Sequence, residues 1–463
     1  MARDKKLNQH VTEETKKHNI EITRCATKAL STCAKSNKIK KAMRKVGAIP
    51  VLAELLTNVN DITILIPVVN TLQECSSDIN YRIAIRNMGL VEHIVRHLKS
   101  DNIELKMHCA SAFRKLCEDK ESSDIVRNQK GLMPLVDLLE FSENKELLIA
   151  ATGAIWRCSA TPKNAEVFEK ANIIETMIGF INHEQPEEVR INCSGAIATL
   201  AKREHNRQEI RDKGGIRNLM SQLGTTTIGL LVNATDAVGV MAEDKESIKT
   251  IIDLDGIRLL WSLLKNPSWE VQASAANAMC PCLKNMEDAG EEVRAYVGGL
   301  EIMMNLLKSN HDEVLAAMCK TIAQIAQDSE NLGIMTDLKV VQLLSSLTAT
   351  KNDLLKVPLC DAIGHCSAKK SNCREFGNEG AVIPILNFMK TTKNEMIRTS
   401  AAFALNQLSE DPQNCITMHK NGVFDIMMET ISSQNKELQQ HSASCLANIR
   451  RLAMCNEQAR YGK

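Results

Sequence analysis

The sequence predicts an all-α solenoid of about ten repeats of about 42 residues, and three observations support this fold class. First, turn residues recur at intervals of 40 to 43 residues along the chain of 463 residues. Second, each interval contains three apolar segments at helical spacing. Third, aromatic residues make up only 3% of the chain, so close helix packing by Leu, Ile, Val, Ala, Met and Cys is expected. The recurring turn residues are Gly47, Gly89, Gly131, Asn172, Gly215, Gly256, Gly299, Lys339, Gly380 and Gly422.

The segment from residue 380 to residue 422 shows one repeat unit clearly. Residues 380–389 form an apolar run, residues 399–408 are rich in small residues, and residues 415–420 are short and amphipathic. We number the short helix before the turn as the first helix of a repeat, the apolar one after the turn as the second, and the small-residue one as the third. Three helices in about 42 residues is the layout of an armadillo (ARM) repeat, so the prediction is a right-handed superhelical ARM solenoid.

Local signals support each helix boundary. Glycine at the turn accepts a positive φ, and Asn172 is the next best tolerated residue. Lys339 is the exception, so the eighth repeat is expected to turn differently. Acidic residues mark the start of third helices, where a carboxylate complements the helix dipole: Glu104, Glu146, Glu188, Glu270, Glu313, Glu395 and Glu437. Asparagines before the turn are expected to cap first helices: Asn37, Asn80, Asn164, Asn206, Asn331, Asn372 and Asn414.

These signals divide the chain into three parts. Residues 1–36 are expected to form N-terminal capping helices or a partial repeat, because 20–34 resembles a lone third helix. Residues 37–455 contain ten armadillo repeats, and residues 456–463 form a polar C-terminal tail.

Composition narrows the possible environments and partners. The 57 basic and 56 acidic residues nearly balance, so neither nucleic acid nor a membrane surface is expected as a partner. No apolar run is long enough to span a membrane, and residues 1–19 lack the apolar core of a signal peptide. Most of the 16 cysteines lie within apolar helices, which favours a reduced, cytoplasmic compartment.

No motif predicts catalysis, a metal or a cofactor. Cys280-Pro-Cys282 is the only tight cysteine pair, and no second pair or histidine pair is in register to complete a zinc site. The sequence contains no HExxH, GxxxxGK[ST] or GxSxG motif. We therefore expect no enzyme activity, and core thiols are the better interpretation of the cysteines.

The exposed positions of third helices are the expected partner-binding groove. Peptide-binding armadillo proteins carry a repeated Asn at one of these positions, and here only Asn448 matches, which disfavours a nuclear-import receptor. The candidate groove residues are Lys115, Arg157, Thr199, Gln324, His365, Gln407 and Asn448. A second candidate surface is a basic run that could bind an acidic partner, unless it is only a solvated first helix: Lys38, Lys40, Lys41, Arg44 and Lys45.

Several stretches outside the repeat consensus carry a more specific resemblance. They are residues 254–267, 280–282, 288–301, 408–419 and 448–453. They resemble the armadillo-repeat subunit family of the outer dynein arm docking complex, from about residue 47 onward. Members of that family carry a long region before the repeats, whereas about 36 residues precede them here, so a short isoform or divergent relative is expected.

The resemblance implies a non-catalytic scaffold that helps dock outer dynein arms onto the doublet microtubules of motile cilia. It implies coiled-coil docking subunits, a tetratricopeptide-repeat docking subunit, the outer dynein arm and the doublet microtubule as partners. It also implies localisation to the cytoskeleton of the ciliary axoneme. The alternative is a cytosolic peptide-binding adaptor for cargo or signalling. A ubiquitin-ligase arm ranks last, because the sequence carries no U-box or RING cysteine pattern.

Overall fold

The computed structural model describes the backbone of residues 2–461 and the side chains of residues 13–455. This described chain consists of α-helices and two short 3-10 helices, η1 and η2, without any strand. It divides into two compact units, Met1–Asn218 and Leu219–Lys463. None of its helices is both long and apolar enough to cross a membrane.

The first unit contains four complete three-helix repeats and the start of a fifth. Its first helices are α2 (Asn37–Lys45), α5 (Ile79–Asn87), α8 (Lys120–Asn128), α11 (Pro162–Lys170) and α14 (Glu204–Asp212). Its second helices are α3 (Ala48–Asn58), α6 (Leu90–His97), α9 (Leu132–Asp137) continued by η1 (Leu138–Glu140), α12 (Ile173–Gly179) and the beginning of α15 (Gly215–Ser221). Its third helices are α4 (Ile62–Cys75), α7 (Ile103–Leu116), α10 (Lys145–Ser159) and α13 (Glu187–Leu200), and α1 (Ala2–Cys33) precedes the repeats.

The second unit completes the fifth repeat and contains five more. Its first helices are α17 (Lys245–Asp253), α20 (Ala289–Ala295), α23 (Ser329–Asp337), α26 (Lys370–Asn378) and α29 (Pro412–Lys420). Its second helices are α18 (Gly256–Leu263), α21 (Gly299–Leu306), α24 (Val340–Leu347), α27 (Val382–Thr391) and α30 (Val423–Ile431). The short helix η2 (Gln222–Gly224) lies at the start of this unit. Its third helices are α16 (Ile228–Met241), α19 (Trp269–Asn285), α22 (Asp312–Ile325), α25 (Asp353–Cys366), α28 (Glu395–Leu408) and α31 (Lys436–Tyr461). The predicted three-helix repeat is therefore confirmed.

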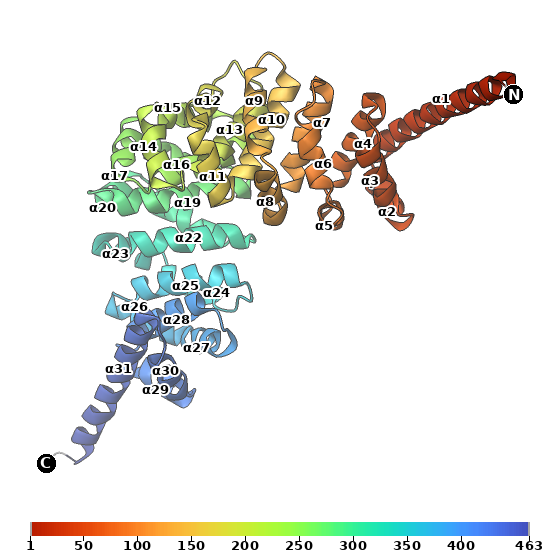
Figure 1. Cartoon of the computed structure of the whole chain (residues 1–463). Helices are drawn as coiled ribbons and strands as arrows, with labels where there is room; N and C mark the ends of the chain where they lie inside the picture. Colours follow the sequence, from red (N-terminus) through yellow and green to blue (C-terminus); the bar gives the residue numbers. More distant parts are fainter. Residues whose placement is uncertain (1, 462–463) are drawn as a thin grey trace. The chain divides into compact units, whose positions relative to one another are not determined.

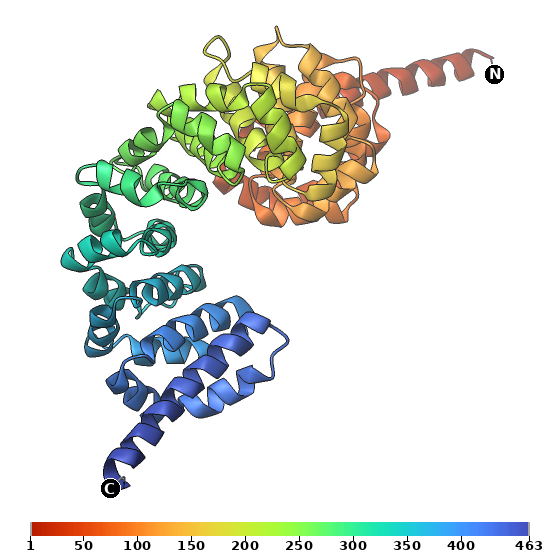
Figure 2. The same ribbon diagram turned by 90° about the vertical axis from the view of Figure 1, so that its left-hand side faces the viewer.

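Third helices form the spine of each unit. In the first unit α1, α4, α7, α10 and α13 each pack against the next, and in the second unit α16, α19, α22, α25, α28 and α31 do the same (Figures 1 and 2). Small side chains make this close packing possible. A Cβ atom added at Gly239 on α16 would lie only 2.9 Å from the Cα atom of Ala278 on α19. The acidic residues predicted at the start of third helices are found in the first turn, as in α7 and α28, so that prediction is confirmed.

All sixteen cysteines, which lie within the described residues, are free thiols, and most of them lie in this core. Burial raises the pKa of the Cys75 and Cys415 thiols to about 11 each. These thiols therefore stay protonated near neutral pH and pack as small apolar side chains.

One residue with positive φ precedes the second helix in each repeat: Gly47, Gly89, Lys130, Asn172, Gly214, Asp255, Gly298, Lys339, Gly380 and Gly422. Lys339 has φ 65°, like its counterparts, so the expectation that the eighth repeat turns differently is wrong. The surrounding helices impose this conformation even on a residue type that rarely adopts it. In four repeats the turn glycine predicted from the sequence lies one residue after the residue that has the positive φ. At Gly215, for example, a Cβ atom would lie 2.6 Å from Ile210 Cγ2, so glycine is required there for close packing.

The expectation that asparagines cap the first helices is also wrong. Aspartates mainly fill that position, as where Asp411 accepts hydrogen bonds from the backbone amides of Gln413 and Asn414. The buried asparagine lies three residues after the cap, where the helix frame turns its side chain inward. Asn414 is buried, and its Nδ2 donates to the carbonyl of Leu408 at 3.0 Å and to that of Cys373 at 2.8 Å.

This inward hydrogen bond recurs as a ladder between successive first helices. Asn164 donates to Ser123 Oγ at 2.8 Å, Asn331 to the Gly290 carbonyl at 3.1 Å, and Tyr81 Oη to the Lys40 carbonyl at 2.6 Å. The partner lies 41 residues earlier in each case, one repeat back along the chain. The ladder satisfies buried carbonyls and fixes the spacing of adjacent repeats.

Ion pairs form a second connection between first helices. The capping aspartates Asp119 and Asp328 contact Arg86 and Arg294 of the preceding repeat, the second pair at 2.8 Å. In one repeat the polarity is reversed, because Arg203 occupies the capping position and contacts Glu169 at 2.9 Å. An ion pair between successive first helices is thus kept, although the basic residue is now at the cap and the acidic residue is on the preceding helix.

The helices at the two chain ends do not test the predicted division at residues 36 and 455. Helix α1 packs against α4, as a lone third helix before the first repeat would. Residues 456–461 continue helix α31, and residue 1 and residues 462–463 lie outside the described residues. The boundaries 1–36, 37–455 and 456–463 therefore stay predictions.

Candidate partner-binding surface

The seven candidate groove residues occupy equivalent positions on third helices; six lie near the C-terminal end of the helix, and Asn448 lies in the middle of the longer α31. All of them are half-buried. In the first unit they are Lys115 on α7, Arg157 on α10 and Thr199 on α13; in the second they are Gln324 on α22, His365 on α25, Gln407 on α28 and Asn448 on α31. Because these helices pack in chain order within each unit, the structure places each set along one row. Binding by either row stays a prediction.

In the first unit the row is basic and contains two internal ion pairs. Lys115 Nζ lies 3.7 Å from a carboxylate oxygen of Glu74 on α4. Glu118, which follows α7, lies 3.2 Å from Arg82. Both acidic residues of this region therefore already have a basic partner.

Arg114 on α7 and Arg157 on α10 lie on neighbouring third helices. Arg157 stacks on the ring of Trp156, with its guanidinium carbon 4.0 Å from the ring centroid. Burial lowers the pKa of Arg157, the charge of Arg114 lowers it further, and Glu118 opposes both effects. The two guanidinium groups are thus close enough to repel each other.

Glycines in the third helices create the space for these large side chains. A Cβ atom at Gly153 would lie 2.7 Å from Arg114 Cδ, and one at Gly195 would lie 2.3 Å from Trp156 Cε2. Sequence reasoning missed Arg114 and Trp156 as surface residues. The available signal was glycine within a helix, which costs roughly 0.5–1 kcal/mol relative to alanine and therefore indicates close packing.

In the second unit, aromatic rings connect three successive third helices. His365 on α25 lies 5.1 Å from the Phe403 ring on α28, and Phe403 lies 5.2 Å from His441 on α31. Gly364 allows this arrangement, because a Cβ atom there would lie 2.4 Å from Phe403. Burial lowers the pKa of both histidines, whereas it raises the pKa of the neighbouring Asp361 carboxyl. Neutral imidazoles are therefore favoured in this row.

The remaining candidates make short-range polar contacts. Asn448 Nδ2 donates to Ser409 Oγ at 2.9 Å, so the one position that matched the armadillo asparagine is engaged with the preceding repeat. Thr199 donates to the Ala196 carbonyl at 2.8 Å and contacts Ser159. Gln407 on α28 is half-buried.

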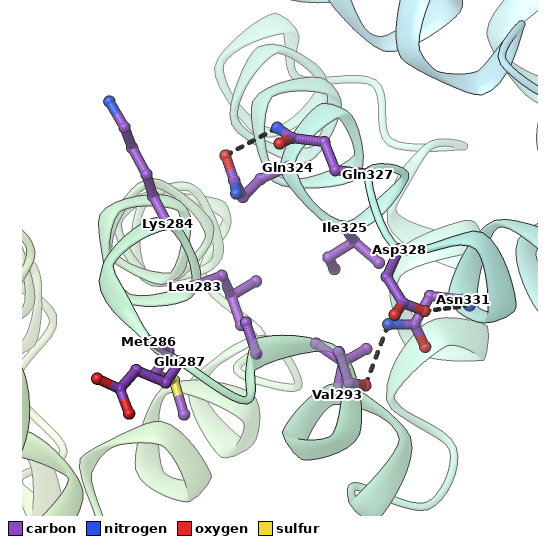
Figure 3. Close-up of a pocket in the computed structure, with 12 residues that line it drawn as sticks. Leu283, Lys284, Met286, Glu287, Val293, Gln324, Ile325, Gln327, Asp328 and Asn331 are labelled. Atoms are coloured by element: carbon purple, nitrogen blue, oxygen red, sulfur yellow. Dashed lines mark hydrogen bonds between the residues drawn. The ribbon is translucent and has the colours of Figure 1, made fainter.

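Gln324 lines a cavity of about 270 Å³ between α19, α20, α22 and α23 (Figure 3). Gln327 Nε2 donates to Gln324 Oε1 at 3.2 Å on one side of this cavity. On the other side Asn331 Nδ2 donates to the Gly290 carbonyl as part of the first-helix ladder. The apolar part of the cavity lining consists of Leu283, Val293 and Ile325. Both hydrogen bonds join residues of the cavity wall to each other, so the cavity is a gap between repeats.

The predicted basic surface on α2 is smaller than expected. Lys38, Lys41, Arg44 and Lys45 are exposed, as an acidic partner would require. Lys40 is only 6% exposed, so its place in that surface is wrong. The helix turns this residue toward α5, where its carbonyl accepts the hydrogen bond of Tyr81. Arg44 also lies 3.9 Å from Asp78.

Among the side chains of residues 13–455, no three His, Cys, Asp or Glu gather closely enough to hold a metal ion. Cys280 is half-buried and Cys282 is buried, and burial raises the pKa of both thiols. Thiols in that state are poor metal ligands, because the thiolate is the binding form.

Comparisons with known proteins give consistent results at the level of sequence. No protein-family model matches the chain. The chain is 42% identical over 443 residues to armadillo repeat-containing protein gudu of Drosophila melanogaster, covering 95% of this chain and 66% of that protein. It is 47% identical over 443 residues to outer dynein arm-docking complex subunit 2 of Bos taurus, covering 96% of this chain and 42% of that protein. It therefore spans less than half of the cattle relative.

Solved structures support the fold alone. A crystal structure of an engineered protein has a TM-score of 0.63 at 23% identity, covering 90% of this chain and 99% of that one. A structure from work on the phosphorylation-controlled interaction between cadherin and β-catenin has a TM-score of 0.59 at 18% identity, covering 93% of this chain and 88% of that one. Together with the repeat geometry, these relatives confirm the armadillo fold, and the chain belongs to the family of armadillo-repeat proteins that includes gudu and outer dynein arm-docking complex subunit 2.

Proposed function

We propose that this protein is a non-catalytic scaffold that helps dock outer dynein arms onto the doublet microtubules of motile cilia or flagella. The observation that carries this proposal is the 47% identity to the cattle docking-complex subunit over 96% of the chain. The match runs through nearly all of the repeats, so it concerns the surface that they build and not one local motif.

The physical properties of the repeats support a scaffold role. Within each unit, successive repeats are joined by a spine of third helices, and several are also joined by the buried hydrogen-bond ladder and by ion pairs between first helices. Such an array holds several binding positions at fixed spacing. The side chains along the rows differ from repeat to repeat, which suits particular folded partners better than a uniform peptide clamp.

The partners in this proposal are the other subunits of the docking complex, namely coiled-coil subunits and a tetratricopeptide-repeat subunit, together with the outer dynein arm and the doublet. The location is the axoneme. No catalytic step is part of the proposal, and the protein contributes only binding energy and spacing.

The test is to express the tagged chain in multiciliated cells and to purify it from isolated axonemes. The expected result is axonemal staining and co-purification of docking-complex subunits after high-salt extraction of the axonemes. Staining confined to the cytosol, with capture of short linear peptides only, would contradict the proposal. That outcome would support the cytosolic peptide-binding adaptor instead.

A further inference from the structure

Two arginines of the first unit have no acceptor for their side-chain hydrogen bonds. Within the described side chains, neither Arg114 nor Arg157 makes a side-chain hydrogen bond or an ion pair, and Arg157 Nε is buried without a partner. A guanidinium carries five N–H donors, and leaving charged donors unpaired in a half-buried place is costly. The two groups lie on adjacent helices and repel each other. An anion between them would accept hydrogen bonds from both groups and would offset their repulsion.

The site is built at a cost to its helices. Gly153 and Gly195 both lie within buried turns of third helices, where glycine has a lower intrinsic helix propensity than alanine. A side chain at either position would displace Arg114 or Trp156. The glycines therefore hold open a surface that consists of Arg114, Arg157 and the ring of Trp156, which we call the Arg114–Arg157 site.

The neighbouring acidic residues neutralise this site only in part, although Glu118 favours the charged form of Arg157. Glu74 is paired with Lys115 at 3.7 Å, and Glu118 is paired with Arg82 at 3.2 Å. Glu118 is close enough to act on Arg157, so a ligand must keep its negative charge away from that carboxylate. A continuous phosphate backbone would meet both acidic residues, whereas separate carboxylates on a protein segment can avoid them.

We propose that the Arg114–Arg157 site binds the carboxylates of an acidic segment of a protein partner. The planar guanidinium groups match a carboxylate with two parallel hydrogen bonds each. The ring of Trp156 offers an apolar surface for the methylene groups of the bound side chains. This inference deepens the proposed scaffold function, on which it rests, by assigning one contact surface and its partner chemistry.

The test uses the purified full chain and a fluorescein-labelled hexaglutamate peptide, with binding followed by fluorescence anisotropy at low salt. The variant carries Arg114→Gln and Arg157→Gln together, and the matched control carries Arg96→Gln, an exposed arginine of α6 in the same unit. We expect at least tenfold weaker binding for the double variant, and no more than twofold for the control. Equal binding by the double variant and the control would overturn the proposal.

Two further measurements separate the possible failures. The first is the binding of a single-stranded oligonucleotide of equal charge. If the oligonucleotide binds more tightly than hexaglutamate, and this difference disappears in the double variant, the partner of the site is a nucleic acid and the proposal of an acidic protein segment is wrong. Thermal melting of the control should match the parent chain, and the double variant should melt only slightly lower, because it loses the stacking of Arg157 on Trp156 but no described hydrogen bond. Lysine at both positions should restore part of the affinity, since charge returns without the two-pronged geometry; no recovery despite an unchanged melt would contradict the charge argument.

The inference and the proposed function can fail separately. If the parent chain enters axonemes but hexaglutamate binding does not depend on the arginines, this inference is wrong and the scaffold proposal stands. If the arginines bind the peptide but the chain stays in the cytosol, the scaffold proposal is wrong and the site belongs to a different partner.

Discussion

Among the asparagine-to-alanine substitutions in the first unit, Asn164→Ala should lower the stability of that unit the most. Asn164 is fully buried, and its Nδ2 donates to Ser123 Oγ at 2.8 Å and to the Cys158 carbonyl at 3.0 Å. Its Oδ1 accepts a hydrogen bond from Arg127 at 2.9 Å. The side chain thus joins two repeats and satisfies the end of a third helix.

The magnitude follows from these three bonds. Each neutral bond contributes about 1 kcal/mol net and the one from arginine about 1.5–3 kcal/mol, so their loss should lower the free energy of unfolding by about 3–5 kcal/mol. Alanine also leaves the Cys158 carbonyl without its donor from Asn164. We expect this loss to be local, because a repeat array can open in part.

The assay is urea unfolding followed by far-ultraviolet circular dichroism, combined with hydrogen exchange of the backbone amides of α8 and α11. Where exchange reports local opening, a loss of about 3 kcal/mol corresponds to exchange on the order of 100-fold faster. Asn80→Ala is the matched control, because Asn80 is exposed on α5 and bonds only to Asp78. A loss below about 1 kcal/mol for Asn164→Ala, or an equal loss for Asn80→Ala, would refute the ladder as a source of stability.

Three further outcomes follow from the packing and the charges. Gly195→Leu should lower stability by about 1–3 kcal/mol and expose Trp156 further to solvent, because even a Cβ atom there would lie 2.3 Å from that ring; tryptophan fluorescence and thermal melting measure both effects. Ala402→Asp should cost several kcal/mol and lower the melting temperature, since Ala402 is 0% exposed and the new charge has no partner. The double variant His365→Gln and His441→Gln should lose less stability than the parent chain between about pH 7 and pH 5. Burial lowers the pKa of both rings below 6.5 in the folded state, so the stability that the neutral rings contribute is present above that pH and is lost as pH falls.

Each of these variants has a control of the same chemistry. Gly179→Ala adds a Cβ atom with nothing within 4 Å, and Ala443→Asp places a carboxylate at an exposed position of α31. His205→Gln removes an exposed imidazole. Asp361 acts in the opposite direction to the histidines, because its folded pKa is raised and protonation stabilises the folded state as pH falls further. A control that loses as much stability as its test variant would show that burial is not the cause.

The repeat architecture was predictable because each repeat carries its own turn and start signals, and ten copies reinforce one another. The role of Lys339 was not, since the left-handed conformation there is set by the helices on either side and not by the residue type. The asparagine ladder was misread for a related reason. Asn164 and Asn80 look alike in sequence, yet a difference of one position in the helix frame buries the first and exposes the second.

The candidate surface was predictable in position but not in chemistry. Equivalent positions on third helices follow from the repeat period, which is why Arg157 and His365 could be named. The contact of Arg114 with Gly153 joins residues of two repeats, and its importance depends on which side chains meet across the spine. Similarly, the burial of Lys40 depends on how α2 packs against α5, which a run of basic residues does not reveal.

The central claim is that the protein docks outer dynein arms, and counting those arms tests it most directly. The protein would be depleted from ciliated cells, and outer arms would be counted per doublet in axoneme cross-sections by electron microscopy. We expect outer arms to be lost while inner arms remain, and re-expression of the chain to restore them. A normal count of outer arms in axonemes that lack the protein would contradict the account.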